Sequence, residues 1–165
     1  MADTIEQKIK ALLTTNTSKQ RIWKELSPTV NHGKLVFHLN NLAPPGRGQQ
    51  VQLLILGLAA ILALITGRQL YAMTLDNRID LTLFLGLVVP IIHFYLLREV
   101  LLCHRTGFQF TAILSLLALL RPENRVGFEP WLYLVMAALA GWLYWFLFPK
   151  KENFIPPPTA DSSES

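Results

Sequence analysis

Apolar and polar positions are distributed unevenly along this chain of 165 residues. Residues 1–50 mix the two at short spacing, whereas residues 51–149 contain four long apolar stretches separated by short polar segments. We expect these stretches to form helices over about residues 51–70, 81–102, 107–121 and 131–148. About 20 apolar residues in a helix cross the ~30 Å hydrocarbon core of a bilayer. The pattern therefore predicts an all-α fold, a polytopic membrane protein with four transmembrane helices.

The third apolar stretch is short for a transmembrane helix. Its apolar part, Phe108 to Leu120, lies between Arg105 and Arg121 and covers about 20 Å as a helix. It forms either a short span or a re-entrant or interfacial helix, and the second alternative leaves three transmembrane helices. We favour four spans, because a helix with apolar residues on nearly every face is difficult to shield from water in any other way.

Residues 1–48 are expected to form a small peripheral segment on the cytoplasmic side. Apolar residues recur at helical spacing over residues 3–15 and again over residues 19–26, which predicts two short amphipathic helices. Residues 34–39 alternate apolar and polar side chains, which predicts a strand. The Pro- and Gly-rich residues 43–48 are then a hinge that leads into the membrane helices.

Positive charge is concentrated before the first expected span. Residues 1–50 hold seven Lys/Arg and three Asp/Glu, whereas the expected bundle, residues 49–149, holds six and five. Basic residues near spans stay on the cytoplasmic side, so we expect a cytoplasmic N-terminus in a bacterial inner membrane or an equivalent membrane. The basic residues form no stripe, so a nucleic acid is not an expected partner. Residues 150–165, with three consecutive prolines, are expected to be a disordered tail.

Ionisable residues at membrane depth are rare and often functional. His93 follows Pro90 by three residues in the second expected span, where the proline leaves a backbone carbonyl without its helical donor. A denser group follows at the expected cytoplasmic end of this span: Arg98, Glu99, His104 and Arg105. We treat all five as candidate functional residues. The alternative is that His93 bonds a neighbouring helix and that the denser group only anchors the span to lipid headgroups.

Enzymatic chemistry is not expected. The four histidines, two of which are His32 and His38, offer no i, i+4 pair for a metal ion. Cys103 is the single cysteine, which excludes a site built on paired cysteines, and no base is placed to activate its thiol. The chain has no glycine-rich phosphate loop, nucleophile elbow or HExxH motif. We therefore expect no catalytic residue, no metal and no cofactor.

Small residues one turn apart mark helix faces on which another helix can pack closely. The expected contact residues are Ala59, Ala63, Thr111, Ser115, Ala137 and Gly141. These faces predict a non-catalytic subunit or assembly factor of a larger membrane complex, such as a secretion or transport machine. Its expected partners are the bilayer and other integral membrane proteins, with a hetero-complex favoured over a homo-oligomer. The alternative is a small oligomeric pore or transporter, with His93 and the segment Arg98–Arg105 lining its path.

Overall fold

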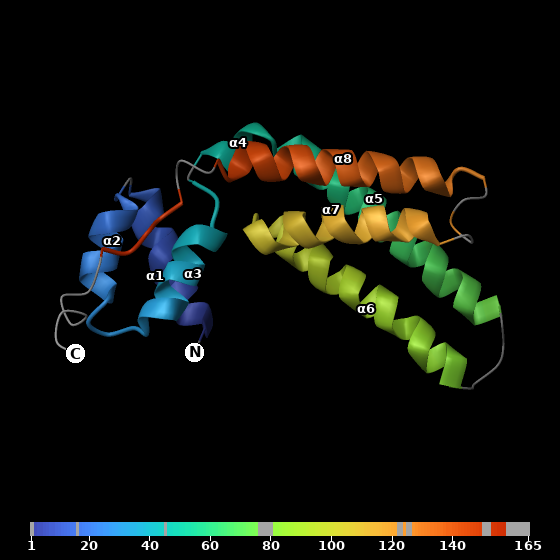
Figure 1. Ribbon diagram of the computed structural model, residues 1–165, viewed down its shortest axis with the longest axis horizontal. Helices are drawn as coiled ribbons and strands as arrows, with labels where there is room; N and C mark the ends of the chain where they lie inside the picture. The colour runs from blue at the N-terminus through green and yellow to red at the C-terminus, as the bar shows by residue number, and fades with distance from the viewer. Residues whose placement is uncertain are drawn as a thin grey trace, which may run out of the picture.

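The computed structural model describes residues 2–15, 17–44, 46–75, 81–121, 124, 127–149 and 153–157. The regular secondary structure of these residues is helical, and one isolated antiparallel bridge joins Leu42 to His104. The expected all-α fold is therefore confirmed. Figure 1 shows a group of short helices at one end of a set of long helices.

The helices fall into two groups. Their bounds are α1 Ala2–Thr14, α2 Lys19–Leu26, α3 His32–Asn41, α4 Arg47–Gln50, α5 Gln52–Leu75, α6 Leu81–Leu101, α7 Arg105–Leu120 and α8 Glu129–Leu147. Helices α1, α2 and α3 pack on one another and are here called the N-terminal unit. Helices α5 to α8 are here called the bundle, and each of the four apolar stretches forms one of them.

The N-terminal unit has a hydrophobic core of its own. Its buried apolar side chains are Ile9, Leu13, Ile22, Trp23, Leu35, Leu39, Leu42 and Phe154. Phe154 comes from the C-terminal tail, and its ring centroid lies 5.4 Å from that of Trp23. Its backbone exchanges hydrogen bonds of 2.7 and 3.0 Å with the amide of Asn40. The expected disorder of residues 150–165 is therefore wrong for residues 153–157, and the rest of this tail lies outside the described residues.

The strand expected over residues 34–39 is wrong, because these residues form part of α3. Leu35 and Leu39 are four residues apart, so a helix places both on one face, where they are fully buried. Phe37, which a strand would have placed beside them, is 53% exposed. The Asn31 side chain caps this helix by accepting hydrogen bonds from the backbone N–H groups of Gly33 and Lys34 at 3.0 and 3.3 Å.

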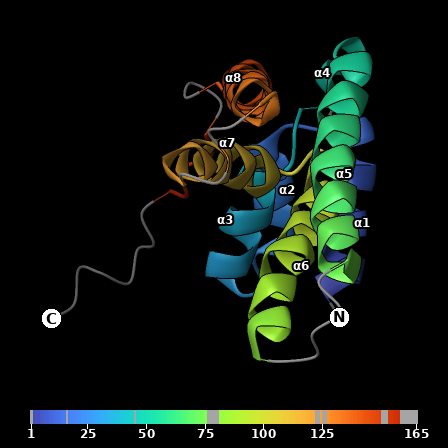
Figure 2. The same cartoon turned by 90° about the vertical axis from the view of Figure 1, so that its right-hand side faces the viewer.

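The bundle is a ring of helices in which consecutive helices run in opposite directions. Helix α5 packs on α6 and α8, and α7 packs on the same two helices. Figure 2 shows α7 and α8 end-on, with α5 and α6 running across the view beside them. Its buried core consists of Val51, Ile55, Leu58, Leu62, Ile65, Leu96, Val100, Phe108, Tyr133, Met136, Ala140, Leu143, Leu147 and Phe148. Because the helices alternate in direction, the start of α5, the α6–α7 turn and the end of α8 all lie beside the N-terminal unit (Figure 1).

Two helices of the bundle are long and apolar enough to cross a membrane. They are residues Gln52–Thr74 of α5, with a mean hydropathy of 2.0, and Glu129–Leu147, with a mean hydropathy of 1.4. Only about a third of each span is buried within the chain, at 33% and 28%. A core helix of a soluble domain would be mostly buried, so the exposed apolar faces of α5 and α8 favour a lipid surrounding. Helix α7 is apolar but shorter.

The α6–α7 turn is tight and depends on close backbone contact. Cys103 adopts a φ of 57°, in the left-handed region that few non-glycine residues occupy. The backbone N–H of His104 donates to the carbonyl of Glu99 at 2.9 Å, which closes the end of α6. A Cβ atom on Gly107 would lie 2.8 Å from the Glu99 backbone, so only glycine allows α7 to start this close to α6.

Candidate functional site

A buried histidine joins the N-terminal unit to the bundle. The Nδ1 atom of His104 lies 2.7 Å from Glu99 Oε2, and its Nε2 atom lies 2.9 Å from Glu6 Oε1. Glu99 is on the last turn of α6, whereas Glu6 is on α1. His104 and Glu99 are 4% and 5% exposed. We call these three residues, with Lys10 and Arg98, the junction network.

Each ring nitrogen of His104 faces one carboxyl group. An ionised carboxylate only accepts hydrogen bonds, so each nitrogen that faces one donates to it. Lys10 Nζ lies 2.8 Å from Glu6 Oε1, and Arg98 Nη1 lies 3.0 Å from Glu99 Oε1. Burial raises the pKa of Glu6, but hydrogen bonds from Lys10 and His104 and their charges outweigh it, so the pKa lies below its ordinary value.

Two neutral contacts add to the junction network. Asn41, at the end of α3, accepts a hydrogen bond from the backbone N–H of Thr106 at 3.0 Å. The bridge between Leu42 and His104 lies directly beside it. The N-terminal unit is therefore fixed to the α6–α7 turn by ionic, side-chain and backbone contacts together. Such a set of contacts defines one orientation of the unit on the bundle.

Arg105 makes different contacts from the rest of the predicted polar group. Its Nε and Nη2 atoms donate to the hydroxyl of Tyr144 on α8 at 3.2 and 2.8 Å, and its Nη1 atom donates to Asn153 at 2.9 Å. Gln109 donates to the same hydroxyl at 3.0 Å. Arg105 thus connects α7, α8 and the C-terminal tail. The structure places Arg98, Glu99 and His104 together and Arg105 apart from them.

His93 lies in a separate polar cavity within the bundle, here called the His93 cavity. It is 7% exposed, and its Nδ1 atom has no hydrogen-bond partner among the described residues. The cavity has a volume of about 200 Å³ and is lined by residues that include Gln69, Arg121, Asn124 and Tyr133. The Oε1 atom of Gln69 also lacks a partner in the described part of the chain. An unpaired buried polar atom is costly, so such a cavity suits a polar occupant.

The predicted helix-contact residues divide into buried and exposed groups. Ala59, Thr111 and Ser115 are buried inside the bundle, and the Ser115 hydroxyl donates to the Thr111 carbonyl. Ala63 is exposed, and a Cβ on Gly141 would meet no atom within 4 Å.

The inward face of α8 carries the buried Ala140 in place of the expected small pair. This face is the stripe Tyr133, Met136, Ala140, Leu143 and Leu147. Ala137 and Gly141 are only half-buried and do not belong to it. Contact of Ala63, Ala137 and Gly141 with helices of another protein stays a prediction.

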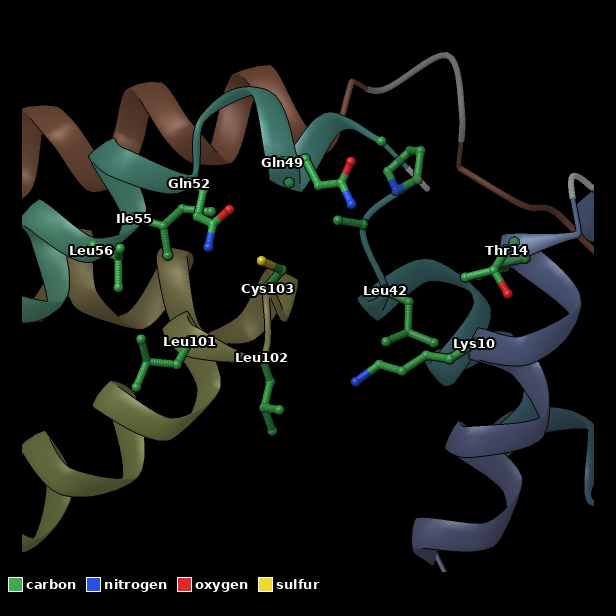
Figure 3. A pocket seen from close by; sticks show the side chains of 15 residues that line it. Lys10, Thr14, Leu42, Gln49, Gln52, Ile55, Leu56, Leu101, Leu102 and Cys103 are labelled. Carbon is green, nitrogen blue, oxygen red and sulfur yellow. The ribbon is translucent and has the colours of Figure 1, made fainter.

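A large crevice lies beside the junction network, and Figure 3 shows it between α1 and the bundle. It has a volume of about 630 Å³, with Lys10 on one side and Gln52, Leu101 and Cys103 on the other. Burial raises the pKa of the Cys103 thiol, which outweighs the opposing charge of Lys10. A thiol that stays protonated is a poor nucleophile, so Cys103 is not activated for attack.

Metal ligation is not supported by these residues. The described part of the chain contains no group of three His, Cys, Asp or Glu side chains that could hold a metal ion. In the junction network the two carboxylates contact opposite nitrogens of His104, so the donor atoms do not converge on one point.

Sequence reasoning missed the residues that complete the junction network. Glu6 and Lys10 belong to α1, 98 residues from His104 in the case of Glu6, and sequence spacing carries no sign of such a pairing. Asn41 and Thr106 are 65 residues apart. Two local features of the sequence point toward this network. Glu6 and Lys10 have the i, i+4 spacing of a helical ion pair, and the glycine at position 107 permits a close turn after His104.

Comparison with known proteins gives no relative for this chain. No protein-family model, no curated protein and no solved structure matches it. We therefore infer function from the geometry and chemistry of the side chains described above.

Proposed function

We propose that the chain is an integral membrane protein in which α5, α6, α7 and α8 all cross the bilayer. The alternating directions of these helices support this arrangement, because the N-terminal unit lies at one end of the bundle only. Helix α6 is about 32 Å long and α7 about 24 Å, so α7 is the shortest crossing. The exposed apolar side chains of α6 and α7 face lipid. They include Phe84, Val88, Ile91, Phe94, Tyr95, Phe110, Ile113, Leu116, Leu117 and Leu120.

The N-terminal unit faces the cytoplasm in this arrangement. The basic residues near the ends of the crossings on its side are Lys34, Arg47, Arg98, Arg105, Lys150 and Lys151. Those on the opposite side are Arg68, Arg78, Arg121 and Arg125. The side of the N-terminal unit thus has six basic residues and the opposite side four, which agrees with the tendency of basic residues to stay in the cytoplasm.

The protein acts as a non-catalytic subunit or assembly factor of a larger membrane complex. The observation that carries this proposal is the junction network, where the buried His104 and Glu99 and their partner Glu6 hold the N-terminal unit in one orientation on the bundle. Lys10 and Arg98 each pair with one of the two carboxylates. A peripheral unit held rigidly on a membrane anchor suits a docking platform for other proteins. Hetero-assembly is favoured over homo-oligomerisation.

Mild detergent extraction followed by mass spectrometry tests this function. We expect the wild-type chain to purify with a different membrane protein in fixed stoichiometry. Glu6→Lys places a positive charge beside His104 and Lys10, so it should release the N-terminal unit and the partner. Glu25→Lys, at an exposed position of α2, is the charge-matched control and should retain the partner. A monodisperse homo-oligomer without other proteins would overturn the proposal.

Cysteine labelling tests the four crossings separately. Cys103 lies in the α6–α7 turn, so an impermeant reagent should reach it only from the side of the N-terminal unit. Asn124 lies beyond the far end of α7, so Asn124→Cys in a Cys103→Ser background should be labelled only from the opposite side. Labelling of position 124 from the same side as Cys103 would mean that α7 does not cross.

A pore or transporter is the second candidate, and the His93 cavity favours it. The segment Arg98–Arg105 does not line that cavity, so this candidate now depends on His93 alone. Flux through vesicles reconstituted with the protein should fall, or change its pH dependence, in His93→Ala. Absent flux, or flux that His93→Ala leaves unchanged, contradicts this candidate.

A further inference from the structure

We propose that the His93 cavity binds the phosphodiester headgroup of an anionic phospholipid, which enters from the side between α6 and α7. The proposal uses the four-crossing arrangement, which places this cavity at the end of the bundle away from the N-terminal unit. It does not depend on assembly with other proteins.

The inner end of the cavity offers hydrogen-bonding atoms without partners. His93 Nδ1 and Gln69 Oε1 are both buried and unpaired among the described residues. The Nε2 atom of Gln69 donates to the hydroxyl of Tyr133 at 3.5 Å, which leaves the Tyr133 hydroxyl hydrogen free to donate to a ligand. A ligand that both donates and accepts hydrogen bonds therefore satisfies this end. The hydroxyl groups and phosphate oxygens of a glycerol phosphodiester do both.

The outer end of the cavity carries a positive charge. Arg121, directly after α7, lines it together with Asn124. A neighbouring cavity of about 140 Å³ shares Asn124 with it and contains Arg68 and Glu129. These two residues form an ion pair of 2.7 Å, so among the described residues that line the two cavities the unbalanced charge is that of Arg121. A guanidinium binds phosphate oxygens in a bidentate manner, which suits the single negative charge of a phosphodiester.

The wall between α6 and α7 is apolar and reaches the outer surface of the bundle. Ile92 on α6 and Leu117 on α7 both line the cavity, yet they are 39% and 51% exposed. Figure 1 shows α6 and α7 separating with distance from their shared turn. A cavity with a polar interior and an apolar side opening matches an amphiphile, whose acyl chains remain in the bilayer while its headgroup enters the protein. This favours a lipid over a free phosphate ester.

The cavity lies at different heights on the helices that line it. Leu114, Leu117 and Ala118 line it and belong to the last two turns of α7. His93 is 12 residues from the far end of α6, about 18 Å along that helix, so a headgroup reaches it below this end and through the side between α6 and α7. Tyr133 occupies the second turn of α8 on the facing side.

Native mass spectrometry of the full chain in detergent tests the proposal. Short-chain phosphatidylglycerol and phosphatidylcholine are titrated separately. Both carry the phosphodiester, but Arg121 repels the choline cation, which also has no hydroxyl group for His93 and Gln69, so we expect phosphatidylglycerol to bind one site roughly tenfold more tightly. Arg121→Gln should abolish this preference, and Tyr133→Phe should reduce it. Arg21→Gln removes an arginine at an exposed position of α2 in the N-terminal unit, and it should keep the preference.

Three outcomes would overturn the proposal. One is equal binding of the two lipids by the wild-type chain. Another is an equal loss in Arg21→Gln and Arg121→Gln, since that indicates general attraction to anionic lipid. The third is competition by glycerol 3-phosphate at the concentration at which phosphatidylglycerol binds, which assigns the site to a soluble phosphate ester. Cysteine labelling reports the four crossings independently, so a failure of lipid binding is distinguishable from a wrong topology.

Discussion

The two buried histidines of this protein have opposite surroundings. His104 has a carboxylate at each ring nitrogen, within 2.9 Å, whereas His93 has an Nδ1 atom without a partner among the described residues. Both are less than 10% exposed. A fully paired buried network fixes structure, whereas an unpaired buried group costs stability and marks a place where a ligand can bind. Burial of a histidine therefore does not define its role, and its partners do.

Among the variants that test this difference between the two histidines, removal of Glu99 should cause the largest loss of stability. Glu99→Ala leaves the buried His104 with one carboxylate and Arg98 without its ion pair, so we expect a loss of about 3–5 kcal/mol in unfolding free energy. Chemical denaturation in detergent measures the change. Glu25→Ala, at an exposed position, is the control and should change stability little. A loss below about 1 kcal/mol for Glu99→Ala would mean that the junction network contributes little to stability.

Substitution of Gly107, at the start of α7 beside Glu99, should cause the next largest loss of stability. A Cβ on Gly107 would lie 2.8 Å from backbone atoms of Glu99 and Val100, so Gly107→Ala forces α7 away from α6. We expect a cost of about 1–3 kcal/mol, measured as above, from overpacking. Gly57→Ala on α5 is the matched control, because a Cβ there meets no atom within 4 Å. Equal stability of the two variants would show that the α6–α7 turn can adjust without cost.

Most helices of this protein could be predicted from its sequence, whereas the contacts of the junction network could not. The four apolar stretches and the amphipathic helices of the N-terminal unit depend on local periodicity, so the sequence predicts them. Residues 34–39 were ambiguous, because alternation over six residues also places Leu35 and Leu39 four apart on a helix face. The pairing of Glu6 with His104 depends on how the N-terminal unit docks on the bundle. That docking is a tertiary property, and residue spacing does not contain it.

Replacement of each histidine by leucine compares the two sites directly. His93→Leu removes an unpaired buried nitrogen, so in phosphatidylcholine we expect a gain of up to about 1 kcal/mol in unfolding free energy. His104→Leu leaves the buried Glu99 and the half-buried Glu6 without their shared partner, so a loss is expected. Thermal unfolding of the two variants under identical conditions measures the contrast. Losses of similar size would mean that His93 has partners equivalent to those of His104.

The smallest expected effect is the acid sensitivity that Glu6 contributes. The folded pKa of Glu6 lies below its ordinary value of 4.5, so its contribution is fully present at neutral pH. It should decline as pH falls below 4.5 toward the folded pKa, because protonated Glu6 no longer accepts hydrogen bonds from both Lys10 and His104. Thermal unfolding of wild type and Glu6→Gln from pH 7 to pH 3 measures this. The difference between the two should shrink toward low pH, and a difference that stays constant would show that the Glu6 charge does not stabilise the junction network.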